Sequence, residues 1–326
     1  MLLSPLHWLP DPPFTAQDFA GSHCPKTGDI VFIQKLCGPY TIALMKSLRH
    51  AGVHTVYVDC DAPLKLNEAA LASRVVCASS SLAGEYTRVG IPAVFIPDAY
   101  EISAPPRGGA LSPNRKLRGV WFGWAGAGRW TQIQDLRAVI DSSLPNWELL
   151  VVSNHPDADV AWDLETVWDH LRGCDAAVLP GENQSAQLKS ANRVVQAMAL
   201  GLPVAAQDTT AYAEVIRHDR NGLLCRSPSD WRAALEHLSV PYHRERLALA
   251  GHRYARRWFS LSRVGRLWEE LLLSLGASRT IPEDEGRAAF LHRARASVCQ
   301  RIAQRLPVSD LQRCYWRLAS RESERA

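Results

Sequence analysis

The sequence predicts an α/β protein with two doubly wound parallel-sheet domains and a helical C-terminal tail. Short apolar runs alternate with amphipathic segments, a stretch rich in Pro and Gly interrupts this alternation once, and the last residues are rich in arginine. Strands that alternate with helices are typical of parallel sheets. A chain of 326 residues with 47% hydrophobic content is long enough for two ordinary cores.

The first domain is predicted to span residues 1–110 and to be small. Its strands are expected at the apolar runs 30–33, 55–58, 75–78 and 93–96. Helices are expected between them, at 39–50 and through Tyr86. The segment 104–115 is rich in Pro and Gly and is therefore predicted to be the interdomain linker.

The second domain is predicted to span residues 116–275. Its strands are expected at 120–122, 147–152, 176–179, 203–206 and 222–225. Helices are expected between these runs, and helices dominate from the last strand to residue 275. Because ligands of such sheets bind outside the carboxyl ends of the strands, site residues are expected in the loops that follow them.

The segment 187–207 gives the strongest functional signal. Wound as a helix, it has an apolar face made of Ala191, Val194, Val195 and Met198. The opposite face carries two cations and two amides at the same spacing: Lys189, Asn192, Arg193 and Gln196. Cations without neighbouring carboxylates, near a helix N-terminus, favour an anion such as phosphate. The alternative is an ordinary solvated helix face.

A glycine-rich loop at 123–129 follows the first strand of the second domain. Glycines such as Gly126 allow the backbone to approach a diphosphate closely, and Arg129 would be a further phosphate ligand. The alternatives are a tight turn and a surface pair of Arg129 with Trp130.

Four segments of the second domain resemble bacterial GT-B glycosyltransferases, the group that includes the retaining family-four enzymes. The clearest is AMALGLPV at 197–204, and the others lie at 120–128, 174–180 and 211–224. The resemblance covers residues 116–275 well and the first hundred only loosely. It implies two Rossmann-like domains, a donor site mainly in the second, an acceptor site in the first, no cofactor and no catalytic metal.

The resemblance also implies roles for individual residues. Lys189 and Arg193 would stabilise the charge of the leaving diphosphate, and Gly126, Arg129, Ser190 and Asn192 would bind the donor. Where the family has a glutamate that meets the ribose, this chain has Gln196. Where the family has a second glutamate eight positions earlier, this chain has Leu188. Glu182 is a candidate substitute for that missing acid, although a loop glutamate is usually only solvated.

Further candidates follow from position alone. The segment with Trp162, Asp163 and Glu165 lies where the nucleotide base docks in this fold, and burial of the tryptophan in the core is the alternative. In the first domain, polar side chains follow each strand and are candidates for the acceptor site or for helix capping. These are Lys35, Asp59, Asp61, Ser79, Ser80, Asp98 and Glu101.

The tail, residues 276–326, is predicted to form a basic helix. It would either lie on an anionic membrane surface or pack against the first domain. A net charge of +4 gives no indication of nucleic-acid binding. Eight cysteines without a Cys-x-x-Cys pair, and an N-terminus unlike a signal peptide, favour a cytoplasmic protein, with peripheral contact at the inner membrane face as an open alternative.

Together these features predict a glycosyltransferase that moves a sugar from a nucleotide diphosphate-sugar to a glycan or lipid-linked acceptor in bacterial surface polysaccharide synthesis. Two alternatives stay open. One is a nucleotide-sugar epimerase or hydrolase on the same fold. The other is a degenerate protein that binds the nucleotide-sugar or a glycan without turnover, because the usual acid pair is absent.

Overall fold

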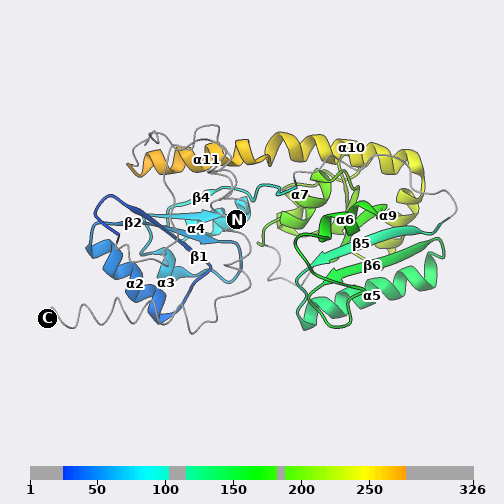
Figure 1. Cartoon of the computed structure of the whole chain (residues 1–326), viewed down its shortest axis with the longest axis horizontal. Coiled ribbons are helices and arrows are strands. Elements are labelled where there is room, and N and C mark those ends of the chain that lie inside the picture. The colour runs from blue at the N-terminus through cyan, green and yellow to red at the C-terminus, as the bar shows by residue number, and fades with distance from the viewer. Residues whose placement is uncertain (1–24, 103–114, 182–187, 277–326) are drawn as a thin grey trace.

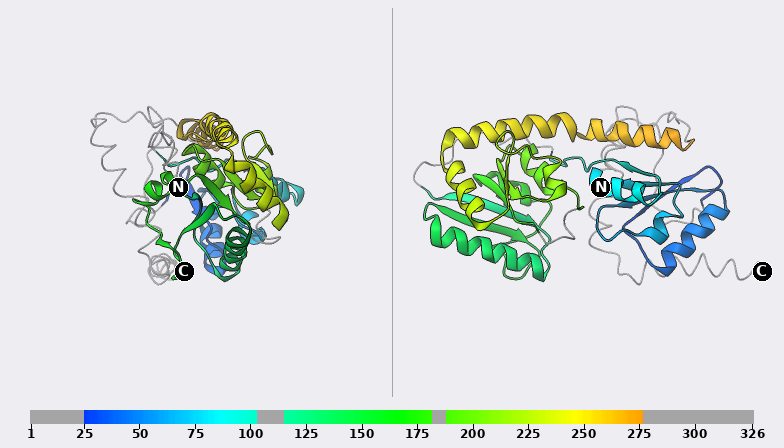
Figure 2. Two further views of the ribbon diagram at one scale, coloured as in Figure 1. Left: turned by 90° about the vertical axis from the view of Figure 1, so that its right-hand side faces the viewer. Right: turned by 180° about the vertical axis from the view of Figure 1, so that it is seen from behind.

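The computed structural model describes residues 25–102, 115–181 and 188–276, which form two α/β domains lying side by side (Figure 1). Two long helices, α10 (Pro241–Trp258) and α11 (Leu261–Ser274), run one after the other along the same side of both domains (Figure 2). This arrangement confirms the predicted fold class. Beyond residue 276, the predicted tail lies outside the described residues.

The first domain contains a four-stranded parallel sheet in the order β1-β2-β3-β4. Each strand agrees with its predicted apolar run to within one residue at either end. The strands are β1 (Ile30–Gln34), β2 (His54–Asp59), β3 (Arg74–Cys77) and β4 (Ala93–Phe95).

Three helices connect these strands: α2 (Pro39–His50), α3 (Leu66–Ala69) and α4 (Ser80–Arg88). Proline at the start of α2 fits the first helical turn, where its missing N–H is not needed. The Ser79 side chain caps α4 by accepting a hydrogen bond from the backbone N–H of Leu82. Buried side chains of the helices and strands form one core on this side of the sheet.

Helix α11 covers the other face of the first sheet. Its buried residues Val264, Trp268 and Leu271 pack against Val56 and Val58 of β2. Sequential parallel strands place their crossover helices on one face, so the opposite face needs a cover from elsewhere in the chain. The sequence assigns residues up to 275 to the second domain, but the apolar face of α11 belongs to the core of the first.

Trp268 is expected to be essential for this packing. It is 4% exposed, and replacing a buried tryptophan by alanine costs about 3–5 kcal/mol of unfolding free energy. Leu273 lies on the same helix but is 40% exposed, so Leu273→Ala is the matched control and should cost less than about 1 kcal/mol. Urea titrations followed by circular dichroism compare the two. Equal losses in both variants would contradict the observed packing.

The second domain contains a six-stranded parallel sheet in the order β10-β9-β8-β5-β6-β7. The chain moves from β5 outward to β7, returns to the other side of β5, and continues outward to β10. The order therefore reverses between β5 and β8, and ligands bind at such switch points. The strands are β5 (Leu117–Gly123), β6 (Trp147–Ser153), β7 (Val160–Ala161), β8 (Ala176–Leu179), β9 (Val204–Gln207) and β10 (Leu223–Cys225).

Helices cover both faces of this second sheet. They are α5 (Ala127–Ser143), α6 (Val167–Arg172), α7 (Asn192–Ala199), α8 (Thr210–Ala213) and α9 (Pro228–Ser239), together with α10. The apolar face predicted for α7 is confirmed, because Val194, Val195 and Met198 are almost completely buried. Helix α10 crosses α7 closely: a Cβ atom on Gly251 would lie 3.1 Å from the Met198 side chain.

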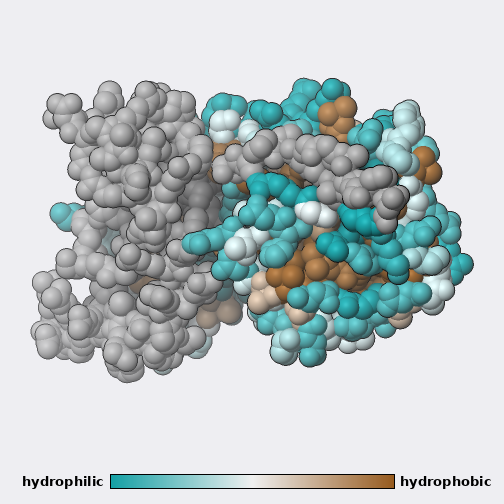
Figure 3. Space-filling view, turned by 45° about the vertical axis from the view of Figure 1, so that its right-hand side comes forward, coloured by the Kyte–Doolittle hydropathy of each residue, from teal (hydrophilic) through white to brown (hydrophobic). Residues whose placement is uncertain are grey.

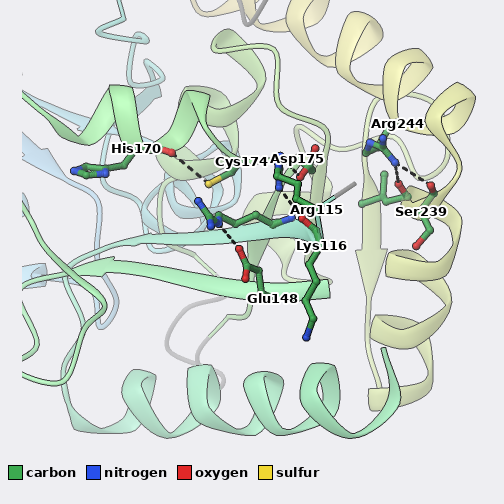
Figure 4. Close-up of polar contacts among 10 residues, drawn as sticks. Arg115, Lys116, Glu148, His170, Cys174, Asp175, Ser239 and Arg244 are labelled. Carbon is green, nitrogen blue, oxygen red and sulfur yellow. Dashed lines mark hydrogen bonds and ion pairs between the residues drawn. The ribbon is translucent and has the colours of Figure 1, made fainter. Parts of the chain in front are cut away.

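Ionic contacts fix the amino edge of the second sheet (Figure 4). The buried Asp175 carboxylate accepts hydrogen bonds from the Arg115 guanidinium at 2.7 Å and from the backbone N–H of Arg118 at 2.8 Å. The Arg118 side chain in turn pairs with Glu148 on β6. These groups lie at the start of β5 and β8, at the edge opposite the expected ligand, so their role is structural.

The described surface visible in Figure 3 is mainly hydrophilic, with one larger apolar area and several smaller ones. Within the described part of the chain, no helix combines the length and the hydropathy needed to cross a bilayer.

Candidate active site

A cavity of about 720 Å³ lies between the two domains at the carboxyl ends of their strands. Its volume is in the range of small-molecule binding sites. Both domains contribute polar side chains to it. Those from the first are Gln34, Lys35, Cys60, Asp61, Asp98 and Glu101, and those from the second are Arg129, Lys189, Ser190, Asn192, Arg193 and Thr209.

Arg193 lies against the loop that follows β5. Gly123, the last residue of that strand, has φ of 129°, and a Cβ atom built there would lie 2.7 Å from Nε of Arg193. The guanidinium carbon also lies 5.2 Å from the ring centroid of Trp121, which is a cation–π distance. The absence of a side chain at Gly123 therefore leaves the space that Arg193 occupies. The loop 123–129 and the segment that contains Arg193 meet at the switch point of the second sheet.

The first turn of α5 presents a second cation to the same cavity. Gly126 is the N-cap of this 17-residue helix, and Arg129 lies three residues later. Arg129 is only 5% exposed and lines the cavity together with Arg193. A helix N-terminus carries a partial positive charge and backbone N–H donors. The loop, the helix start and the two arginines together suit a polyanion such as a diphosphate.

Helix α7 begins at Asn192, so the predicted two-faced helix from residue 187 is wrong in its first turn. The Ser190 hydroxyl accepts a hydrogen bond from the backbone N–H of Asn192 at 3.0 Å and donates one to the Asp98 carboxylate. Such a local side-chain bond competes with helix formation. Lys189 therefore precedes the helix, and its Nζ lies 3.7 Å from Asp61 of the first domain.

Gln196, for which a ribose contact is predicted, lies beside the chain that leaves β4. The residue is 3% exposed, and its amide N–H donates to Asn192 Oδ1 at 2.9 Å and to the backbone carbonyl of Ala99 at 3.4 Å. Its amide oxygen accepts from the backbone N–H of Glu101 at 3.1 Å. Gln196 thus holds the chain that leaves β4, and its polar atoms are engaged within the protein.

The remaining second-domain candidates are Glu182, Trp162 and Asp163. Glu182 lies outside the described residues, whereas its neighbour Gly181 lines the cavity. Trp162 is half-buried against the core of the second domain, as its alternative interpretation expected. Asp163 accepts hydrogen bonds from the backbone N–H groups of Glu165 and Thr166, at 2.8 and 3.0 Å, just before α6. Asp163 therefore stabilises the turn that precedes α6.

Of the first-domain candidates, some line the cavity and others are structural. Asp59 is 1% exposed and accepts a hydrogen bond from the Tyr86 hydroxyl at 2.6 Å, so it is structural. Asp61 reaches the cavity and lies 3.2 Å from Nζ of Lys35, a residue with a positive φ of 59°. Burial alone would raise the pKa of Asp61, but attraction to Lys35 and Lys189 outweighs burial and lowers it.

Two further carboxyl groups of the first domain line the cavity. Burial raises the pKa of Asp98, and the hydrogen bond from Ser190 opposes that rise. Burial also raises the pKa of Glu101. The first-domain wall of the cavity is therefore rich in carboxyl groups, whereas the second-domain wall carries Arg129, Lys189 and Arg193. In the described part of the chain, no three His, Cys, Asp or Glu side chains are grouped as metal ligands.

Glu214, which follows α8, links the domains beside this cavity. Its carboxylate accepts hydrogen bonds from the backbone N–H groups of Ser80 and Ser81 at 2.9 and 2.8 Å, and from the Ser81 hydroxyl. These donors form the N-terminus of α4, where a negative charge is favourable. A second contact is made by the Ser79 hydroxyl, which donates to the backbone carbonyl of Leu188 at 2.7 Å.

Glu214→Ala is expected to weaken the contact between the domains. The variant loses a charged acceptor that two backbone donors share, and hydrogen bonds to charged groups contribute about 1.5–3 kcal/mol each. Small-angle X-ray scattering should show a larger radius of gyration than in the wild type. Glu245→Ala, a glutamate substitution on α10, is the control. An unchanged radius in Glu214→Ala would show that this contact does not hold the domains together.

Comparison with known proteins agrees with this geometry. Residues 131–239 match the family model of the glycosyl transferases group 1. Sucrose-phosphate synthase from Thermosynechococcus elongatus is similar in structure, with a TM-score of 0.58 and 15% identity over 76% of this chain and 74% of that chain. HepE from Anabaena, in complex with UDP and glucose, has a TM-score of 0.59 and 15% identity over 76% and 78% of the two chains.

The lipopolysaccharide outer core galactosyltransferase WaaB is also similar, with a TM-score of 0.55 and 14% identity over 76% of this chain and 75% of that chain. No curated protein matches the sequence. These structural similarities, at such low identity, concern the fold. The chain therefore has the GT-B fold, and the part of it that matches the glycosyl transferases group 1 model lies in the second domain.

Proposed function

We propose that this protein is a glycosyltransferase that moves a sugar from a nucleotide diphosphate-sugar to a glycan or lipid-linked acceptor. The observation that carries the proposal is the convergence of Arg193, Arg129 and the start of α5 on one interdomain cavity at the switch point of the second sheet. The family match and the GT-B fold support the same reaction class.

In the proposed reaction, the bond between the anomeric carbon and the diphosphate oxygen breaks, and its electron pair leaves with the diphosphate. The acceptor oxygen bonds to the anomeric carbon as the hydroxyl proton is released. Arg193 supplies a planar fork of donors for the phosphate oxygens, and Lys189 supplies a point charge from the cavity wall. Preorganised cations of this kind stabilise the departing charge without a metal ion or a cofactor.

The carboxyl-rich wall of the first domain faces these cations. Carboxylates accept hydrogen bonds from hydroxyl groups and repel phosphate. We therefore assign the acceptor to the first-domain side and the diphosphate to the second-domain side. We also propose a role in bacterial surface polysaccharide synthesis, in the cytoplasm or at the inner membrane face, where residues 276–326 are the candidate membrane contact.

The experiment that tests the reaction is an assay of nucleotide release. The protein is incubated with UDP-, GDP-, ADP- and CMP-sugars, with and without a panel of glycan and polyprenyl-linked acceptors. UDP-glucose is the first donor to test, because the similar Anabaena protein is in complex with UDP and glucose. The proposal predicts that an acceptor increases release at least tenfold. Release of free sugar at the same rate without any acceptor would indicate a hydrolase instead.

One observation favours a second candidate, a protein that binds the nucleotide-sugar without turnover. Leu188 and Gln196 occupy the two positions of the family's acid pair, and Gln196 is buried and engaged with the chain after β4. Binding of a nucleotide-sugar, without release in the presence of any acceptor tested, would support this candidate over the transferase.

A further inference from the structure

An exposed tryptophan projects from the loop between β5 and α5. Trp124 is 70% exposed, the largest value among the large apolar side chains in the described part of the chain. It lines the interdomain cavity together with Arg129 and Arg193. The other large apolar side chains of this cavity are buried or half-buried, as Tyr212 and Trp268 are. An exposed aromatic ring within a site is an available contact surface for a ligand.

The backbone of the next turn supports this ring. A Cβ atom built on Gly126 would lie 3.1 and 3.3 Å from Cζ3 and Cη2 of the Trp124 indole. The indole therefore rests against the N-cap of α5 and still keeps most of its surface exposed.

The first-domain residues of the cavity provide hydrogen-bond acceptors. Asp61 and Glu101 of the first domain line the same cavity, and the Asp61 side chain is 37% exposed. Carboxyl oxygens accept hydrogen bonds from hydroxyl donors. A pyranose ring has an apolar face of C–H groups and a rim of hydroxyl groups. An aromatic ring and carboxyl groups that line one cavity are complementary to these two features.

We propose that Trp124 is the stacking platform for a neutral pyranose ring, with Asp61 and Glu101 accepting hydrogen bonds from its hydroxyl groups. The ring is either the sugar of the donor or the first sugar of the acceptor, since both present the same chemistry. This inference deepens the proposed function by assigning sugar recognition to a side chain separate from the phosphate-binding arginines.

The test compares Trp124→Ala, Trp124→Phe and the control Tyr242→Ala with the wild type. Tyr242 is 69% exposed, nearly as much as Trp124, and lies at the start of α10 outside the cavity. Calorimetry measures the affinity for three classes of probe: the nucleotides UDP and GDP, their glucose and mannose derivatives, and neutral hexose trisaccharides. The KM for the acceptor is measured wherever turnover is detected.

Trp124→Ala is expected to bind UDP or GDP within about twofold of the wild type, because the arginines are retained. The same variant should bind the nucleotide-sugar about tenfold more weakly if the ring is the donor's, or raise the acceptor KM by about as much if it is the acceptor's. Trp124→Phe should recover most of the loss, because it keeps an aromatic face. Tyr242→Ala should match the wild type.

Two results would overturn the inference. In the first, Trp124→Ala loses affinity for the free nucleotide as strongly as for the nucleotide-sugar, so that the ring binds the nucleotide. In the second, no sugar-containing probe responds to the substitution. If the wild type binds no nucleotide at all, the proposed function fails, and the trisaccharides then test the stacking platform on their own. Trisaccharide binding that depends on Trp124 would support the platform. Trisaccharide binding that does not depend on Trp124, or no such binding, would overturn it.

Discussion

Arg193→Ala is expected to weaken the affinity for the nucleoside diphosphate by a factor of about 10–100. A guanidinium that forms charge-assisted hydrogen bonds to phosphate contributes about 1.5–3 kcal/mol, and the cation–π contact with Trp121 fixes its position. Arg193→Lys should retain part of the affinity, since it keeps the charge but loses the planar fork. Isothermal titration calorimetry with UDP and GDP measures the difference.

The control for this variant is Arg88→Ala. Arg88 is an exposed arginine at the end of α4 in the first domain, and it pairs with Glu85 on the same helix. The control removes one positive charge from the protein without changing the cavity, so it reports the effect of net charge alone. Thermal unfolding without ligand confirms that each variant is folded. If Arg193→Ala and Arg88→Ala bind the nucleotide equally well, Arg193 does not bind the diphosphate.

Gly123→Ala is expected to impair both stability and nucleotide binding. The residue has φ of 129°, a conformation that side chains other than glycine rarely adopt, and its new Cβ atom would lie 2.7 Å from Nε of Arg193. Backbone strain of this kind costs about 1–3 kcal/mol, and Arg193 must move to make room. Urea unfolding and calorimetry should show the two losses together.

Gly128→Ala is the matched control for this second prediction. Gly128 lies five residues later in the first turn of α5, and a Cβ atom there would have no neighbour within 4 Å. Alanine is the better helix former by about 1 kcal/mol, so this variant should be as stable as the wild type or more stable. Its nucleotide affinity should be unchanged. Normal binding by Gly123→Ala would show that the loop does not position Arg193.

Much of the fold follows from local sequence patterns. Strand positions such as 54–59 and 147–153 are apparent because buried parallel strands are continuous apolar runs bounded by polar loops. The alternation of strands and helices also indicates which end of each strand lies at the carboxyl edge of the second sheet. The residues after β5 are therefore expected near the ligand. Loop 123–129 and Arg193 do meet there, as the sequence analysis expects of a donor site.

Other features depend on tertiary contacts that periodicity does not report. The sequence predicts the apolar face of the helix that contains Gln196 correctly. The Gln196 side chain, however, forms hydrogen bonds with the segment after β4, which is far away in sequence. The start of α7 depends on the hydrogen bonds of Ser190 to Asp98 and to the Asn192 backbone. The apolar face of α11 covers the first domain, and nothing local in the sequence indicates which domain this helix covers.

The sequence patterns do not indicate Trp124 as a functional residue. Eleven tryptophans occur in the chain, and most large aromatic residues in a sequence belong to a core. One signal was available: Trp124 lies between Gly123 and Gly126 in a loop already assigned to the ligand edge. Its neighbour Trp121 is completely buried, so exposure, rather than residue type, distinguishes the two.

The most direct test of the account is a crystal structure of the protein with a bound nucleoside diphosphate. We predict that the phosphate oxygens lie within hydrogen-bonding distance, about 2.7–3.2 Å, of the Arg193 guanidinium and of a backbone N–H at the start of α5. The nucleotide should lie on the second-domain side of the interdomain cavity. A diphosphate bound away from both groups, with Arg193 still stacked on Trp121 and making no contact to it, would contradict the account.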